Sequence, residues 1–238
     1  MISGHQFFCF YKMKKGLIIW LLVCIAIIGG ATLLFNKLDN GSEVSAANLP
    51  AHVFHSGDLI FQSSLSAQSI AIKLATHSNY SHCGIIYADK DKYYVLEAVS
   101  PVKITPFYEW ISRGEKERFV VKRLKNANVL LNDSNIAKLK IGAEKFIGKP
   151  YDIYFEWNDE KIYCSELIWK VFHNALNIDF CPTRKLSSFD LTAPQVHELM
   201  YNRYQNNIPL NETVVAPVDI FQSPLLETIF ANGEVIKN

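Results

Sequence analysis

Cys164 and His82 have the residue types and the setting that nucleophilic catalysis requires. Cys164 begins the segment CSELIWKVFHNAL, which is predicted to form a helix. Partial positive charge and N–H donors at a helix N-terminus lower the pKa of a thiol and favour its nucleophilic thiolate. Ser165 and Glu166 suit a first helical turn and are unusual beside a purely structural cysteine. A small buried residue remains the commoner alternative for an arbitrary cysteine.

His82 is the histidine best placed to act as the base that such a cysteine needs. It opens the predicted strand HCGIIYA, where its ring can face a cleft while Ile85 and Ile86 alternate away from it. The other histidines beyond the N-terminal segment lie before the first strand, at a helix end or on helix surfaces: His52, His55, His77, His173 and His197. The pair predicts acyl transfer through a thioester, with the backbone N–H of Cys164 as one donor to the oxyanion.

Glu97 is the candidate for the third group, which orients the imidazole of a catalytic histidine. It interrupts the predicted strand YYVLEAV between Leu96 and Ala98, where a carboxylate is poorly explained as core. Strand alternation is equally compatible with a Glu97 side chain that points to solvent. Both interpretations stay open at the level of the sequence.

The composition indicates a folded domain that does not bind nucleic acid. Apolar residues form 49% of the chain and charged residues 20%, which is typical of a globular protein with a sizeable core. Residues 1–46 contain four Lys and two acidic residues, which leaves 20 basic and 21 acidic residues in the remainder. This near-neutral balance lacks the positive charge that contact with a phosphate backbone requires.

The cysteine count predicts at least one free thiol. Of five cysteines, Cys83, Cys164 and Cys181 follow the N-terminal segment, and an odd number cannot pair completely. On a strand, the side chain of Cys83 faces away from His82, so we expect it to pack under the sheet and not to react. No paired Cys or His spacing supports a zinc site built from His82, Cys83 and Cys164, and we expect no metal or other cofactor.

The N-terminal region is predicted to target the chain to a membrane. Residues 16–35 form an uncharged run of twenty residues, long enough to cross a bilayer as a helix, after three lysines (Lys12, Lys14 and Lys15). Positive charge before an apolar run keeps the N-terminus in the cytoplasm, so the rest of the chain is exported. The small residues VSA at 44–46 form a usable cleavage site, which leaves a signal peptide and a retained anchor as alternatives.

We therefore divide the chain into a signal peptide or membrane anchor with its linker, residues 1–46, and a catalytic domain, residues 47–238. The domain is expected in the periplasm or on the outer face of the cytoplasmic membrane. If the N-terminal helix is not cleaved, the membrane is a partner through that helix.

The pattern of the domain predicts an α+β fold in which an antiparallel sheet packs against helices. GDLIFQ is a short strand followed by a helix, and three runs rich in β-branched and aromatic residues should be adjacent antiparallel strands: SHCGIIYA, YYVLEAV and RFVVKRL. One helix should follow an Asp-Ser cap at 133–134 and stop at Gly148, and a second should run over about 164–174. The tail holds a short helix after Thr192 and a packing segment, TVVAPVDIF.

Six ordered blocks of this sequence resemble the YiiX type of permuted papain-like cysteine hydrolase, within the NlpC-like superfamily. They are GDLIFQ, THSNYSHCGII, VLEAVSPVKITP, GKPYD, YCSELIWKVFHNAL and NIPLNETVVAP, and they span roughly residues 53–222. In that family the strand with the histidine precedes the helix with the cysteine, the reverse of papain, as His82 precedes Cys164 here. One departure is Cys83, where a small or polar residue is expected. The resemblance implies a permuted papain-like fold with Cys164 as nucleophile, His82 as base and Glu97 as its orienting partner.

The substrate is less well defined than the chemistry. The resemblance suggests peptide amides of the cell wall, or amides and esters that carry an acyl chain, so a cysteine peptidase or amidase and a lipid-directed acylhydrolase or acyltransferase both remain. A binding protein that holds an amino acid or lipid in the same cleft is a third alternative, although a pure binder has no need of all three catalytic groups. Tyr151 and Tyr163 are candidates to line the cleft, with plain packing as the alternative.

Overall fold

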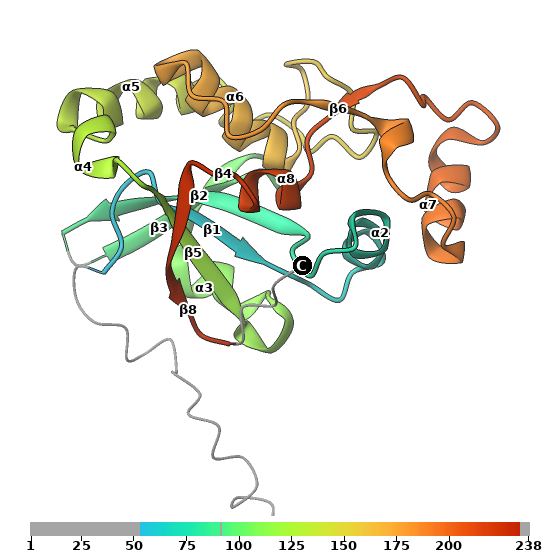
Figure 1. Ribbon diagram of the computed structural model, residues 1–238, viewed down its shortest axis with the longest axis horizontal. Helices are drawn as coiled ribbons and strands as arrows, with labels where there is room; N and C mark the ends of the chain where they lie inside the picture. The colour runs from blue at the N-terminus through green and yellow to red at the C-terminus, as the bar shows by residue number, and fades with distance from the viewer. Residues whose placement is uncertain (1–52, 91, 234–238) are drawn as a thin grey trace, which may run out of the picture. The chain divides into compact units, whose positions relative to one another are not determined.

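The computed structural model describes residues 53–90 and 92–233 (Figure 1). The predicted membrane segment at 16–35, the VSA site and the linker lie outside the described residues. Within residues 53–90 and 92–233, no helix has both the length and the hydrophobicity needed to cross a membrane.

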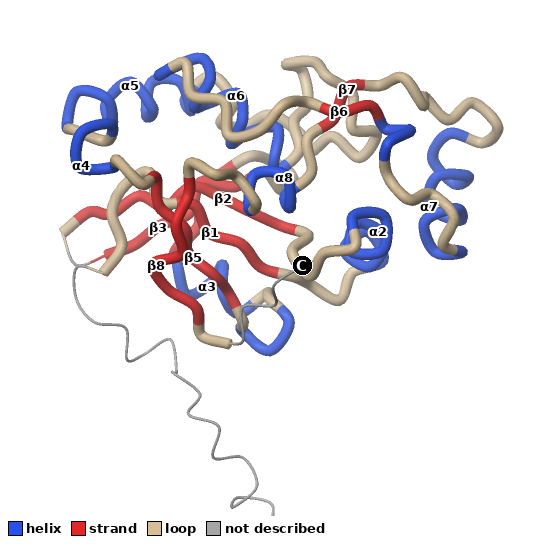
Figure 2. Tube along the Cα trace, in the orientation of Figure 1, coloured by secondary structure: helices blue, strands red, loops and turns tan. Residues whose placement is uncertain are grey.

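A six-stranded sheet forms the centre of the described domain (Figure 2). Every neighbouring pair of its strands is antiparallel. The strand order is β4-β3-β2-β1-β5-β8. The strands are β1 (Leu59–Gln62), β2 (His82–Asp89), β3 (Lys92–Glu97), β4 (Lys103–Pro106), β5 (Phe119–Leu124) and β8 (Leu226–Ala231). A separate two-stranded sheet pairs β6 (Arg184–Lys185) with β7 (Thr213–Val214).

The helices cover both faces of the sheet and one of its ends. They are α2 (Ala67–Thr76), α3 (Phe107–Ser112), α4 (Ala127–Leu130), α5 (Asp133–Glu144), α6 (Cys164–Leu176), α7 (Pro194–Tyr204) and α8 (Pro217–Phe221). Two short 3-10 turns are η2 (Glu115–Glu117) and η3 (Leu186–Ser188). In Figure 1, α5 and α6 lie on one side of the sheet, α3 lies on the other, and α2 lies beside α7.

The two faces of the sheet bury different cores because successive strand residues point in opposite directions. In β1, Leu59 and Phe61 belong to the cluster that includes the inner faces of α5 and α6, whereas Ile60 belongs to the cluster around Trp110 of α3. We call these the α6 face and the α3 face. The first face is the larger core, and both contribute residues to the candidate site.

The predicted order of the strands was wrong at one position. We expected β5 to lie next to β2 and β3, but β1 lies between β2 and β5, so that Phe61 pairs with Cys83 on one side and with Val120 on the other. The physical reason is that all four residues of β1 are buried, which suits a central strand covered on both faces. The short strands β4 and β8 were not predicted, because most of their residues are exposed or half-buried.

The two helices on the α6 face form largely where the periodicity placed them. α6 begins at Cys164, and its inward residues Leu167, Ile168, Val171 and Phe172 are all fully buried, which confirms the prediction. The predicted boundaries of α5 were wrong at both ends. Its N-cap is Asn132, whose side chain accepts a hydrogen bond from the backbone of Asn135, and the helix ends at Glu144, short of Gly148.

The C-terminal tail packs as predicted, and its helix also forms one side of a cavity, which was not predicted. Val215 and Ile220, from the TVVAPVDIF segment, join the core of the α6 face. The helix after Thr192 is α7, whose Val196 and Met200 form a third apolar cluster with Ala71 of α2. This α2–α7 cluster stands beside the N-terminal end of α6 and bounds the cavity described below.

Candidate active site

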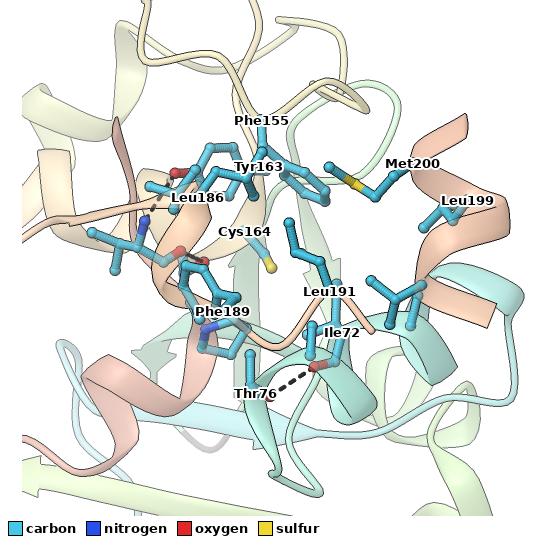
Figure 3. A pocket seen from close by; sticks show the side chains of 18 of the residues that line it. Ile72, Thr76, Phe155, Tyr163, Cys164, Leu186, Phe189, Leu191, Leu199 and Met200 are labelled. Carbon is cyan, nitrogen blue, oxygen red and sulfur yellow. Dashed lines mark hydrogen bonds between the residues drawn. The ribbon is translucent and has the colours of Figure 1, made fainter. Parts of the chain in front are cut away.

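Cys164 is the first residue of α6, and its side chain is buried at the edge of a cavity. Only 2% of the residue is exposed, and its sulfur points into the space between α2, α7 and the start of α6 (Figure 3). The helix begins there because Tyr163 has an extended backbone and Glu166, three residues on, turns its carboxylate back to accept from the Tyr163 backbone N–H at 3.3 Å. The thiol therefore lies where the helix N-terminus favours a thiolate.

His82 lies between Glu97 and Cys164 at the beginning of β2. Its Nε2 is 2.8 Å from Oε2 of Glu97, which reaches it from the end of the neighbouring strand β3. Because Glu97 occupies Nε2, Nδ1 is the ring nitrogen left to hydrogen-bond Cys164. The structure thus brings the three predicted residues together from two adjacent strands and one helix.

Glu97 is held by two further donors that the sequence interpretation did not include. The residue is fully buried, so the alternative in which it points to solvent is wrong. Its Oε1 accepts from Oγ1 of Thr105 at 2.5 Å and from Nη2 of Arg113. Burial by itself would raise the pKa of Glu97, but the hydrogen bonds from His82, Thr105 and Arg113 outweigh it and lower that pKa to about 2. The carboxylate is therefore ionised throughout the neutral range.

The imidazole of His82 is held in the protonated form by its two neighbours. Burial would lower its pKa, but hydrogen bonds to Cys164 and Glu97 raise the pKa to about 9. The ring also stacks on the indole of Trp110, with 5.7 Å between centroids and an interplanar angle of 23°. The stacking fixes the plane of the ring, and Glu97 fixes which nitrogen faces the cysteine.

The sulfur of Cys164 receives hydrogen bonds from two neighbouring residues of β2. The side chain of Cys83 makes the larger contribution and His82 the next, and together they lower the pKa of Cys164 well below that of an ordinary thiol, against the effect of burial. At neutral pH the pair is therefore a Cys164 thiolate beside a His82 imidazolium. This charge distribution is the one that nucleophilic attack by a cysteine requires.

Cys83 packs under the sheet as the sequence predicted, but it also has a neighbour that the sequence did not indicate. Strand alternation does turn it away from the side of Glu97 and Trp110, and it is fully buried. However, that turn directs it toward α6, where it meets Cys164. The prediction placed Cys83 correctly on its strand but missed the contact, because the side of the sheet covered by α6 is a tertiary property.

A predominantly apolar cavity of about 80 Å³ adjoins the sulfur of Cys164. Residues from α2, α7, the segment before α7 and the start of α8 form its walls, and Figure 3 shows Ile72, Leu191, Leu199 and Met200 around it. A group bound there would have an apolar environment directly beside the thiolate.

Tyr151 and Tyr163 both line this cavity, as predicted for the cleft, but their hydroxyl groups differ. The Tyr163 hydroxyl accepts from the backbone N–H of Val215 at 3.1 Å, which ties it to the chain behind the cavity. The Tyr151 hydroxyl accepts from Nε2 of Gln68 at 2.8 Å, so its own proton remains to be donated. Tyr151 therefore has a donor available near Cys164.

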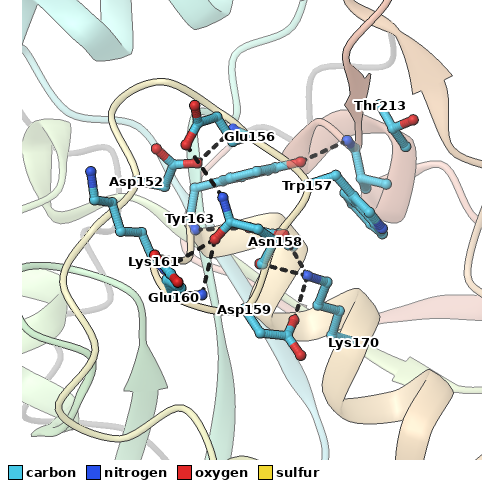
Figure 4. Close-up of polar contacts among 12 residues, drawn as sticks. Asp152, Glu156, Trp157, Asn158, Asp159, Glu160, Lys161, Tyr163, Lys170 and Thr213 are labelled. Carbon is cyan, nitrogen blue, oxygen red and sulfur yellow. Dashed lines mark hydrogen bonds and ion pairs between the residues drawn. The ribbon is translucent and has the colours of Figure 1, made fainter.

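The loop between these two tyrosines is held by its own polar contacts (Figure 4). The Asp152 carboxylate accepts from the backbone N–H groups of Tyr154 and Glu156, and Nζ of Lys170 contacts both the carbonyl oxygen of Asn158 and the carboxylate of Asp159 at 2.7 Å. These contacts fix the path of the chain between Tyr151 and α6, the helix that begins with the nucleophile.

Three comparisons with known proteins agree with one another. Residues 53–230 match a family model described as permuted papain-like amidase enzyme, YaeF/YiiX, C92 family. The chain is 48% identical over 173 residues to the uncharacterized protein YiiX of Escherichia coli strain K12, which covers 73% of this chain and 84% of that protein. A crystal structure of YiiX from another Escherichia coli strain, described as a metalloprotein, matches with a TM-score of 0.71 and 47% identity over 74% of this chain and 97% of that one.

This chain belongs to the permuted papain-like amidase family of YaeF and YiiX. The resemblance that we drew from six sequence blocks is confirmed, as is the α+β fold with an antiparallel sheet and helices.

The crystallised relative is described as a metalloprotein, which raises the question of a metal site in this chain. Residues 53–90 and 92–233 contain no cluster of three or more His, Cys, Asp or Glu side chains that could hold a metal ion. His82 and Cys164 bind each other, and Glu97 is saturated by three donors. The donors at this YiiX-like site therefore do not fit a metal centre.

Several residues of this YiiX-like site were missed because nothing in their local sequence indicates the site. Thr105, Trp110 and Arg113 lie in the segment after β3, and they reach Glu97 and His82 only because that segment folds back onto the α3 face. Ser165 and Glu166 lie in the first turn of α6, as the sequence suggested, and both are buried. The Ser165 hydroxyl donates to the carbonyl oxygen of Val215 at 2.7 Å.

Proposed function

We propose that the chain is a cysteine amide hydrolase in which Cys164 attacks the carbonyl carbon of the substrate. The observation that carries this proposal is the position of His82, which contacts Glu97 with one ring nitrogen and Cys164 with the other. The thiolate attacks to form a tetrahedral intermediate, and the His82 imidazolium gives its proton to the leaving amine. Water, deprotonated by the now neutral His82, then hydrolyses the thioester.

The backbone N–H of Cys164 and the hydroxyl of Tyr151 are our candidates for the oxyanion donors. The first is a free N–H at a helix N-terminus, beside the attacking sulfur. The second has an unused proton, because Gln68 donates to its oxygen, and it faces the same cavity as Cys164. A preorganised donor at this position stabilises the negative charge that develops in the transition state.

The physiological substrate has two candidate classes, and the cavity favours one of them. Peptide amides of the cell wall fit the proposed chemistry and an exported location. However, the side chains around the cavity are largely aliphatic and aromatic: Ile72, Phe155, Leu186, Phe189, Leu191, Leu199 and Met200. Such walls favour an aliphatic acyl group over a polar peptide, because each buried methylene contributes about 0.8 kcal/mol of binding. A lipid-directed acylhydrolase or acyltransferase is therefore the second candidate function.

A binding protein without turnover remains the rival from another class. It is disfavoured because a binder has no need of a thiolate, an imidazolium and a buried carboxylate held together. We also propose, on the sequence alone, that the chain acts outside the cytoplasm, through either a signal peptide or an anchor in residues 1–46.

Thiol reactivity separates an enzyme from a binder. We expect iodoacetamide at pH 6.5 to modify Cys164 first, because its pKa is lowered, whereas burial raises the pKa of Cys181 to about 12 and holds the pKa of Cys83 well above that of an ordinary thiol. Peptide mapping by mass spectrometry identifies the labelled site. Faster labelling of Cys83 or Cys181 would remove Cys164 as the nucleophile.

A matched series of substrates separates the two candidate classes. The full chain would be incubated with cell-wall fragments and with N-acetyl, N-octanoyl and N-palmitoyl amides of one amine, and amine release would be followed. The cavity predicts that kcat/KM rises with chain length. Leu191→Trp, which fills the cavity, should remove that rise, whereas Trp at the exposed Leu210 should not. Release from cell-wall fragments alone would favour the peptide amide.

A further inference from the structure

Cys83 is a buried nucleophilic side chain that the proposed hydrolysis does not use. It lies in β2, fully buried on the α6 face, within the same core cluster as Cys164. Its thiol and its backbone N–H both act on the sulfur of Cys164 and lower the pKa of that sulfur. None of the three cysteines in residues 53–90 and 92–233 forms a disulfide, so the two sulfurs are neighbouring free thiols.

The two thiols differ in access. Cys164 lines the cavity and its sulfur points into it (Figure 3), whereas Cys83 is fully buried and does not line the cavity. They also differ in protonation, because Cys164 is a thiolate near neutral pH and burial keeps Cys83 a thiol. A small oxidant that enters the cavity therefore meets the reactive sulfur first and leaves the second one unreacted.

We propose that Cys83 and Cys164 form a reversible disulfide when a hydroperoxide enters the cavity, with Cys83 as the resolving thiol. The Cys164 thiolate attacks the nearer peroxide oxygen, and the O–O bond breaks. The products are the sulfenic acid of Cys164 and an alcohol or water, whose proton comes from His82. Cys83 then attacks the Cys164 sulfur, so that the S–S bond forms and the sulfenic oxygen leaves as water. The two thiols lose two electrons, and the hydroperoxide gains them.

This inference rests on the proposed function, because it takes Cys164 as a reactive thiolate. Its consequence is a stop in turnover that a reductant can reverse, since the nucleophilic sulfur is held in the disulfide. Without a neighbouring thiol, a sulfenic acid continues to sulfinic acid, which thiol reductants do not restore. Cys83 thereby protects the nucleophile as well as blocking it.

The test uses the full chain, reduced and then exposed to hydrogen peroxide. Free thiols are blocked with iodoacetamide, and peptides are mapped by mass spectrometry without reduction. We expect a peptide pair that links Cys83 to Cys164, lost amide hydrolysis, and near-complete recovery of both free thiols and activity with dithiothreitol. Two results would overturn the proposal. In the first, peroxide converts Cys164 to the sulfinic acid while Cys83 stays a free thiol and is alkylated. In the second, Cys164 is not oxidised by peroxide and is still alkylated by iodoacetamide.

Matched variants assign the role of each sulfur. Cys83→Ala should oxidise to the sulfinic acid of Cys164 and lose activity irreversibly, whereas Cys181→Ala, in a half-buried cysteine away from the site, should behave as the wild type. If Cys83→Ala does not fold, the peptide map of the oxidised wild-type chain still tests the proposal. Reduced enzyme in which iodoacetamide fails to modify Cys164 would instead contradict the proposed function, so the two failures are distinguishable.

Discussion

The two faces of the sheet contribute to the candidate site in contrasting ways. On the α6 face, the nucleophile Cys164 lies among apolar side chains, next to a cavity and a second thiol. On the α3 face, Glu97 is surrounded by donors from Thr105, Arg113 and His82. The difference teaches that the α6 face provides the cavity beside the nucleophile, whereas the α3 face provides the charged group that orients His82. His82 joins them because it is the first residue of its strand and can reach both.

The largest expected effects come from the two groups that react. Cys164→Ala and His82→Ala should each lower kcat by at least about 10⁴, and the double variant should be no worse than either alone, because the two act as one unit. Amide hydrolysis and circular dichroism would be measured together. His197→Ala, an exposed histidine of α7, is the matched control. Retained activity in either variant would place the nucleophile or base elsewhere.

Glu97→Gln removes charge from the α3 face while keeping the shape of the side chain. We expect kcat to fall about tenfold to a thousandfold, below the roughly 10⁴ of a buried aspartate in a serine protease. Combination with His82→Ala should add almost nothing, because there is then no base to orient. Glu109→Gln, on the exposed side of α3, is the control for charge.

Folding must be checked for Glu97→Gln, because the buried carboxylate also holds Thr105 and Arg113. The thermal midpoint would show any lost stability. If Glu97→Gln is folded and fully active, or if its effect simply multiplies with that of His82→Ala, then Glu97 does not orient His82. The α3 face would then contribute no charged group to catalysis.

Tyr151→Phe tests the polar group that the cavity side contributes. Loss of one oxyanion donor lowers kcat by about 10²–10³ in a serine protease, and we expect at most about a hundredfold here, because the Cys164 backbone N–H remains. KM for a short-chain amide should change little. Tyr108→Phe, at an exposed tyrosine, is the matched control. A change in KM alone would make Tyr151 a wall of the cavity and not a donor.

Arg113→Gln should have the smallest effect on rate and a distinct effect on pH. The His82 imidazolium has a pKa of about 9, so kcat/KM should fall as the pH rises through that value. The Arg113 guanidinium donates a hydrogen bond to the Glu97 carboxylate and partly neutralises its negative charge. Without it the carboxylate stabilises the imidazolium more strongly, so the pKa of His82 and the basic limb should move to higher pH, by up to about one unit.

The pH profile of amide hydrolysis measures this shift, with Arg118→Gln as an exposed control on the loop before β5. A fall in kcat with an unmoved basic limb would make Arg113 a structural residue. The acid limb reports Cys164, whose thiolate is lost as the pH falls through its lowered pKa.

The sequence alone determined the local features of this protein. The start of α6 at Cys164, its inward residues, and the strands that bear His82 and Glu97 follow from periodicity, capping and β-branched composition. These patterns depend on neighbours a few residues apart. The six blocks also identified the family, since their order along the chain carries that information.

The tertiary structure decided what each side chain meets. Strand alternation turned Cys83 away from His82, but only the packing of α6 on that face made it a neighbour of Cys164. The sequence was equally compatible with a Glu97 that orients His82 and a Glu97 that points to solvent. The segment that folds back after β3 decides between them, because it brings Thr105 and Arg113 to the Glu97 carboxylate. The physical reason is the same in each case: burial, pKa and contact depend on atoms brought together across long stretches of chain, which no local pattern records.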